Sequence, residues 1–218
     1  MKQSLVSRFF RKLNKIFIIL SLRAKFRRQP IDLKQLAEYP SPSSGRSLDI
    51  GSGPNPRNPF QAGVAFGIDI RSWDKNCNVN KCLLGTERIP FEDNFFDFVT
   101  AYDVLEHIPR VVNEKSTAEF PFVQAMNEIW RVLKVGGLFY SQTPCYPMRE
   151  AFQDPTHVNV MTEDTLRLYF GEAEWARIYG YTGTFSTVTE GWLGSHYFCV
   201  LRKTTDIPVF DLNQTQKD

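Results

Sequence analysis

The stretch that decides the fold is Leu48-Asp49-Ile50-Gly51-Ser52-Gly53-Pro54-Asn55. A short, mostly apolar run ends at Ile50 and passes directly into a turn with two glycines. Gly51 and Gly53 allow the backbone to turn sharply and to approach a ligand closely, because glycine has no Cβ atom. Open α/β sheets bind nucleotide-like ligands at such turns, just beyond the end of a parallel strand. The stretch therefore predicts an α/β fold with a nucleoside-type site at this turn.

A second segment, Gly67-Ile68-Asp69-Ile70, supports this site and helps to indicate which ligand it binds. Asp69 lies 18 residues beyond Gly51, close to the roughly 20 residues at which an acid that binds ribose hydroxyls is expected. The dinucleotide fingerprint requires a third glycine, and this chain has Pro56 at that position. Hydride transfer on a dinucleotide is therefore the least favoured interpretation.

Asp49, Gly51 and Gly53 form the pattern D-x-G-x-G, which resembles motif I of class I S-adenosylmethionine-dependent methyltransferases. The resemblance, to the small-molecule and glycan-associated, methyltransferase type 11-like group, extends through LDIGSGPNP, GIDI, IPFEDNFFDFVTAYDVLEHI, EIWRVLKVGGLFYSQTP and FQDPTHVNVMTEDTLRLYF. It implies an α/β, Rossmann-like, seven-stranded sheet with a reversed last strand and helices on both faces. It also implies methyl transfer with S-adenosyl-L-methionine as the cofactor.

The same resemblance assigns a cofactor site. It implies that the glycine turn wraps the methionine part of the cofactor, that Asp69 takes the ribose, and that two residues at the end of the fourth strand face the amino group or the substrate. The predicted cofactor-binding residues are Asp49, Gly51, Ser52, Gly53, Asp69, Tyr102 and Asp103. The acid that usually contacts adenine is absent, and Asn80, Lys81 and Cys82 stay open as its replacement.

Methyl transfer from a sulfonium is an in-line displacement that needs proximity, orientation and, for a hydroxyl acceptor, a base. Histidine is the natural base near neutral pH, and the chain has three. His157 is predicted as the base, with Asp154 orienting its ring or holding a sugar hydroxyl, while a purely structural loop is the alternative. His107, which follows Glu106, is predicted as either catalytic or a helix-start packing residue, and His196 as structural.

No metal site is expected, because methyl transfer does not require one. The four cysteines show no zinc spacing and are interpreted as the reduced thiols of a cytoplasmic protein.

The order of expected elements fits a sheet that ends in an antiparallel strand. Three prolines between Gly53 and Val64 argue for a loop rather than a full helix there. Strands are expected at 64–70, 77–80, 96–102, 138–143, 183–190 and 195–202, helices at 120–133 and 162–178, and a polar and aromatic loop at 144–161.

The chain divides into four expected segments. These are a basic amphipathic helix at residues 1–28, a linker at 29–45 with a short helix near Ile31 to Tyr39, a methyltransferase domain at 46–203 and a polar tail at 204–218. The first 28 residues carry nine Lys or Arg and no Asp or Glu. Their apolar run from Ile16 to Leu22 is much shorter than the ~20 residues of a membrane span, and no signal-peptide cleavage site follows it.

Several partners fit this basic helix. It is interpreted as lying on an anionic membrane surface, or as packing on the protein's own body or on a second subunit in a homodimer. Nucleic acid is the least favoured of its partners. The favoured function is methylation of an oxygen on a small-molecule or glycan-type acceptor. The alternatives are an RNA or protein methyltransferase that docks through the helix, and a non-catalytic nucleotide-binding scaffold.

Overall fold

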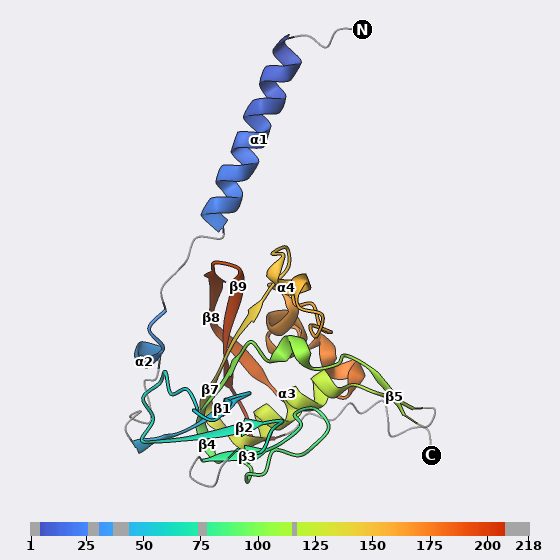
Figure 1. Cartoon of the computed structure of the whole chain (residues 1–218). Helices are drawn as coiled ribbons and strands as arrows, with labels where there is room; N and C mark the ends of the chain where they lie inside the picture. The colour runs from blue at the N-terminus through green and yellow to red at the C-terminus, as the bar shows by residue number, and fades with distance from the viewer. Residues whose placement is uncertain (1–4, 26–30, 37–43, 74–77, 115–116, 208–218) are drawn as a thin grey trace.

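A computed structural model of the chain describes residues 5–25, 31–36, 44–73, 78–114 and 117–207. Its centre is a seven-stranded sheet with the order β3-β2-β1-β4-β7-β9-β8 (Figure 1). The strands are β1 (Arg46–Ile50), β2 (Val64–Asp69), β3 (Val79–Lys81), β4 (Phe96–Tyr102), β7 (Leu133–Pro144), β8 (Phe185–Leu193) and β9 (His196–Lys203).

β9 is antiparallel to both of its neighbours, and the pairs among β1, β2, β3, β4 and β7 are parallel. The predicted seven-stranded sheet with a reversed last strand is therefore confirmed. β4 occupies the middle of the sheet, and its first six residues are all buried, which explains its nearly continuous apolar sequence. β1 pairs with β4 in parallel, so the segments that follow the two strands emerge at the same edge.

The two faces of the sheet are covered differently. One face packs against α3 (Pro121–Val132), which buries eight side chains. Pro121 fits the first helical position, where no backbone N–H is needed. The other face is covered by the short α2 (Leu33–Leu36) and the proline-rich loop after β1, whose Phe60 stacks on Phe98 at 4.5 Å between ring centroids. Helices thus lie on both faces of the sheet, as expected. On the second face, however, the helix is α2, which is only four residues long.

The predicted helix at 162–178 is wrong. In its place stand a π-helical turn, η3 (Arg167–Gly171), and a 3-10 turn, η4 (Trp175–Tyr179). Glu174 between them has a φ of 49°, a left-handed conformation that interrupts a right-handed helix.

The chain also forms three elements that were not expected. They are the hairpin β5 (Val112–Glu114) with β6 (Thr117–Glu119), the 3-10 turn η2 (Leu105–His107) and α4 (Glu150–Gln153), which lies inside the predicted 144–161 loop.

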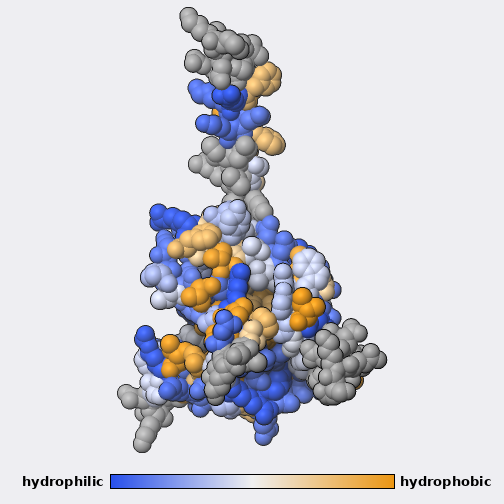
Figure 2. All heavy atoms as spheres, turned by 90° about the vertical axis from the view of Figure 1, so that its right-hand side faces the viewer, coloured by the Kyte–Doolittle hydropathy of each residue, from blue (hydrophilic) through white to orange (hydrophobic). Residues whose placement is uncertain are grey.

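The N-terminal helix α1 (Leu5–Lys25) stands apart from the sheet (Figure 1). Figure 2 shows hydrophilic and hydrophobic side chains on opposite sides of it. Five of its apolar side chains are 44% to 73% exposed: Phe10, Leu13, Ile16, Phe17 and Leu20. These five side chains are therefore not buried against the body, contrary to one of the expected alternatives. In the parts of the chain that the structure describes, no helix is both long enough and apolar enough to cross a membrane.

Candidate active site

The glycine turn has the backbone that its sequence predicts. Gly51 and Gly53 have φ angles of 65° and 58°, which favour glycine over other residues. The amides of Gly51 and Ser52 both donate to the carbonyl oxygen of Ile68, at 2.8 and 3.2 Å. A Cβ atom on Gly51 would lie 2.8 Å from the side chain of Val104. The turn is therefore tied to β2 on one side and closed by Val104 on the other.

Asp69 lies against this turn, as the spacing predicts. Its Oδ2 accepts a hydrogen bond from the amide of Gly53 at 3.0 Å, and its Oδ1 accepts one from Arg71 at 2.9 Å. A Cβ atom on Gly67 would lie 2.3 Å from Oγ of Ser52. Gly67 thus lets the turn pack directly on β2, a role that the sequence analysis missed although this glycine opens the quoted GIDI segment.

Asp49 has a different place from the one expected. Its side chain is fully buried, where it accepts hydrogen bonds from the Thr100 hydroxyl at 2.6 Å and from the Arg57 amide at 2.8 Å. Burial raises the pKa of this carboxyl group, against the effect of these hydrogen bonds. The geometry argues against direct contact of the Asp49 side chain with a ligand and for a role in holding the loop after β1.

Tyr102 and Asp103 lie at the end of β4, at the same edge as the glycine turn. The Arg57 guanidinium lies over the Tyr102 ring, 4.5 Å from its centroid, and burial raises the pKa of Tyr102 to about 12. Asp103 is exposed, has a φ of 53°, and places Oδ1 3.1 Å from Nε2 of His196.

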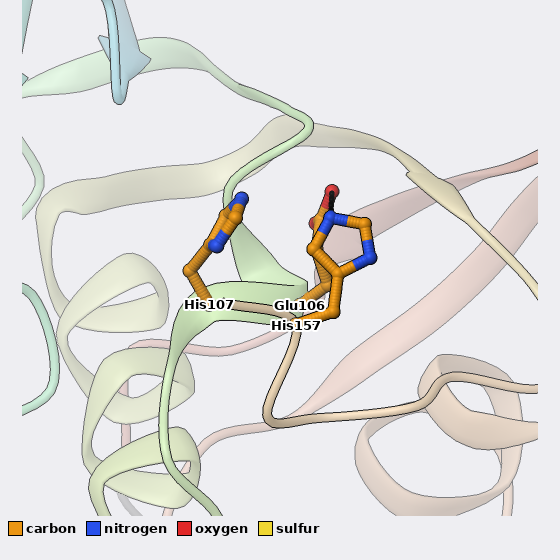
Figure 3. A group of neighbouring side chains, drawn as sticks. All are labelled: Glu106, His107 and His157. Carbon is orange, nitrogen blue, oxygen red and sulfur yellow. Dashed lines mark ion pairs between the residues drawn. The ribbon is translucent and has the colours of Figure 1, made fainter. Parts of the chain in front are cut away.

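The histidines predicted as catalytic lie together, although they are far apart in the sequence (Figure 3). Glu106 and His107 belong to η2, just after β4, and His157 belongs to the loop after β7. The two imidazole rings meet edge to face, with centroids 4.9 Å apart. Oε1 of Glu106 lies 3.9 Å from Nε2 of His157.

Glu106 is the member that sequence reasoning left without a role. Its side chain is buried, and its Oε2 accepts a hydrogen bond from the Thr143 hydroxyl at 2.7 Å. Its Oε1 has no hydrogen-bond partner among the residues that the structure describes. Its position directly before His107 was the available signal. A buried acid with one free oxygen, facing a histidine, is a typical feature of a functional site.

The sequence predicted that Asp154 orients the His157 ring or holds a sugar hydroxyl. In the structure, Asp154 makes no hydrogen bond to His157. The closest approach, from Oδ2 to Nε2 of His157, is 3.9 Å. Its Oδ1 instead accepts hydrogen bonds from the amide and hydroxyl of Thr156, at 2.8 and 2.6 Å. The carbonyl oxygen of Thr156 lies 3.1 Å from Nδ1 of His107. Asp154 therefore positions His107 through Thr156.

A cavity of about 450 Å³ lies next to Asn159, two residues beyond His157, although none of Glu106, His107 and His157 lines it. Its wall includes Asn159, whose amide donates to the carbonyl oxygen of Glu106 at 2.9 Å. The lining is mostly apolar and aromatic and includes Phe120, Phe122, Val160, Tyr169, Phe170 and Tyr179. Figure 2 shows that hydrophobic side chains gather on the face of the body that points to the right in Figure 1.

Comparison with protein families gives one match, a family described as a methyltransferase domain, over residues 48–141. This range begins in β1, ends in β7 and includes the glycine turn, Asp69, Glu106 and His107. This part of the chain is therefore similar to a methyltransferase domain. A comparison with curated protein sequences finds no match.

Solved structures share the fold of this chain at low sequence identity. A chain of the complex between the Haloferax volcanii Trm112 methyltransferase activator and a methyltransferase matches with a TM-score of 0.52 and 15% identity, over 80% of this chain and 89% of that one. A SAM-dependent methyltransferase from Aquifex aeolicus matches with a TM-score of 0.50 and 18% identity, over 85% and 93%. The [4+2]-cyclase SpnF also matches, with a TM-score of 0.50 and 16% identity, over 79% and 80%.

The residues of the glycine turn fit an S-adenosylmethionine cofactor. The turn is a cradle in which a Cβ atom on Gly51 would collide with Val104, and the Asp69 carboxylate stands at its rim. Cys82 is buried, so Asn80 and Lys81, which are exposed, are the better candidates for the missing contact to adenine.

Proposed function

We propose that this chain is an S-adenosylmethionine-dependent methyltransferase that acts on an oxygen of a small-molecule or glycan-type acceptor. The observation that carries the proposal is the cluster of Glu106, His107 and His157 at the carboxyl edge of the sheet. Val104, which lies against Gly51 in the glycine turn, is two residues before Glu106. This proximity of the cluster to the glycine turn supports the proposal that the acceptor meets the methyl donor here.

A hydroxyl acceptor reacts faster when its proton is removed, and a histidine can accept that proton near neutral pH. The cofactor supplies an electrophilic methyl group. Nε2 of His157 would take the proton from the acceptor hydroxyl as the oxygen attacks. The Glu106 carboxylate, 3.9 Å away, would stabilise the imidazolium that forms. Thr143 holds the other oxygen of this carboxylate and fixes its orientation.

The cavity next to Asn159 favours one kind of acceptor. Aromatic and aliphatic side chains line most of it, and ligand pockets of a few hundred Å³ with such walls bind apolar groups. A small molecule that carries its hydroxyl on an apolar or aromatic portion fits better than an unsubstituted sugar.

We also propose that α1 lies on an anionic membrane surface while the methyltransferase works in the cytoplasm. The exposed apolar side chains and the basic residues of α1 lie on opposite sides of the helix, the pattern of an interfacial helix. A homodimer joined through α1 is the competing arrangement. Nucleic acid is the less favoured partner, because aromatic residues on an apolar helix face do not suit phosphate contact.

The experiment is methyl transfer from isotope-labelled S-adenosylmethionine to a panel of aromatic alcohols, isoprenoid alcohols, glycosides, RNA and protein. We expect label on an oxygen of an apolar acceptor. His157→Ala should lower turnover by about 10²-fold, with little change in S-adenosylhomocysteine affinity. His196→Ala is the matched histidine control and should keep most of the turnover. Label on nitrogen or carbon, or only on RNA or protein, would refute the proposal.

A further inference from the structure

We propose that Glu106, His107 and His157 bind a divalent transition-metal ion. One possible ligand atom from each residue lies within 4.8 Å of those of the other two (Figure 3). Two imidazoles and one carboxylate form a set that suits Zn²⁺, Co²⁺, Fe²⁺ or Mn²⁺ and leaves coordination positions open for a further ligand.

The carboxylate presents a free ligand atom in a buried place. Glu106 is 1% exposed, and its Oε1 has no hydrogen-bond partner within the described residues. Oε2 is held by the Thr143 hydroxyl. A buried carboxylate oxygen without a partner is costly, and a metal ion at this position would satisfy it.

The histidines are held in the way that metal-binding histidines usually are. Nδ1 of His107 lies 3.1 Å from the carbonyl oxygen of Thr156, and Nδ1 of His157 lies 3.4 Å from that of Ala151. A carbonyl oxygen can only accept a hydrogen bond, so these contacts favour the tautomer in which Nδ1 carries the proton. The Thr156 hydroxyl also lies 3.1 Å from Nδ1 of His107, but it donates its proton to Oδ1 of Asp154. Each Nε2 then keeps its lone pair for a metal. Metal-binding histidines typically donate their other ring N–H to a carbonyl oxygen or a carboxylate in this way.

The distances require only a small closure of the site. Ligands that bind at about 2.0–2.2 Å from an ion stand at most about 4.4 Å apart. Nε2 of His157 and Oε1 of Glu106, 3.9 Å apart, are already within that range. The Asp154 carboxylate, with Oδ2 3.9 Å from the same Nε2, adds negative charge beside the site.

The metal site is inferred from geometry alone, whereas its role rests on the proposed function. An acceptor hydroxyl bound at an open position would have a lowered pKa and would release its proton to water. Its oxygen would then form the C–O bond as the S–C bond breaks, and the sulfur would keep the bonding electron pair. The metal would thereby replace the His157 imidazole as the group that activates the hydroxyl, and the expectation of a metal-free protein would be revised.

Calorimetric titration of the full-length, untagged, chelator-treated chain with Co²⁺, repeated with Zn²⁺, tests the site. We expect one Co²⁺ per chain, with visible absorption typical of nitrogen and oxygen ligands. Glu106→Gln keeps the side-chain shape and an acceptor for Thr143, and it should weaken Co²⁺ binding at least tenfold. His157→Ala should do the same, whereas His196→Ala should bind like the wild type.

Failure of the wild type to bind either ion would overturn the site. So would equal Co²⁺ affinity in Glu106→Gln and wild type, or a thiolate-to-cobalt absorption band, which would indicate a cysteine site. S-adenosylhomocysteine titration of each variant shows whether it is folded and separates the two proposals. Full methyl transfer in the presence of a chelator would overturn the role of the metal and leave the proposed function intact.

Discussion

At the scale of single residues, the cofactor site depends on glycines whose side chains would collide with specific neighbours. Gly51 faces Val104, and Gly67 lies beneath Ser52 and Pro56. Side chains added to a packed place force their neighbours to move and typically cost about 1–3 kcal/mol. At Gly67 the neighbour that would have to move is the turn expected to hold the cofactor.

Gly67→Ala is therefore predicted to weaken S-adenosylhomocysteine binding at least tenfold while the chain remains folded. The added Cβ would lie 2.3 Å from Oγ of Ser52 and 2.9 Å from Cβ of Ser52. Adding Ser52→Gly removes both contacts, so calorimetry should show part of the affinity restored in the double variant. Wild-type affinity in Gly67→Ala would contradict this account of the turn.

A second residue-scale prediction concerns His196. Its hydrogen bond to the Asp103 carboxylate raises the pKa of His196 above its usual 6.5, against the effect of burial. Glu106 and Glu150 also favour the charged ring. Because the pKa is raised on folding, the pair stabilises the protein fully below about pH 6.5 and loses this effect as pH rises through the folded-state pKa.

The measurement is the free energy of urea unfolding for the wild type and His196→Gln between about pH 6 and 8. The difference between them should shrink as pH rises. Asp103 is 47% exposed, so the pair should contribute no more than about 1 kcal/mol. A difference that grows with pH would exclude this ion pair as the cause.

At the scale of elements, α1 combines an exposed apolar stripe with basic residues and no Asp or Glu. Such a helix binds anionic lipid through both apolar burial and charge. The first element of the sheet, β1, begins at Arg46. The residues assigned to the cofactor site lie at or beyond Asp49, and none of them belongs to this helix.

We predict that deletion of residues 1–28 abolishes binding to anionic vesicles and leaves S-adenosylhomocysteine affinity unchanged. Each basic residue near such a surface adds ~1 kcal/mol, so salt should weaken the binding of the full chain. A matched variant with Phe10, Leu13 and Phe17 changed to Ser keeps the charge and should bind vesicles weakly. Vesicle binding by the truncated chain, or its unfolding, would contradict the prediction, and a change from dimer to monomer would favour the homodimer.

At the scale of the whole molecule, the sequence was sufficient for the parts of the fold that local patterns determine. The strand at Phe96–Tyr102 and the turn at Gly51 and Gly53 follow from apolar runs and glycines. The failed helix at 162–178 shows the limit, because the residues from Thr162 to Asp164 suit a helix start but the chain forms two separate turns. Of these, η3 contacts β8, and η4 contacts η3. The spacing of apolar residues in the sequence does not indicate that Glu174, between the two turns, adopts a left-handed conformation.

The candidate site shows a second limit. The adjacency of Glu106 and His107 is visible in the sequence, but the place of His157 depends on the order of β4 and β7 in the sheet. Whether Asp154 contacts His157 or Thr156 depends on the path of a loop. Such non-local geometry follows from tertiary packing. Residue types therefore predicted the two histidines, and only the structure showed their contacts and brought in Glu106.

The central claim is that the glycine turn and Asp69 bind the S-adenosyl cofactor, and it matters because the same fold also occurs in a [4+2]-cyclase. The most direct measurement is calorimetric titration of the full chain with S-adenosylhomocysteine, alongside Asp69→Ala. We predict binding of one molecule per chain by the wild type and loss of binding in Asp69→Ala, with the fold retained. Equal affinity of the two chains, or no binding by the wild type, would contradict the account.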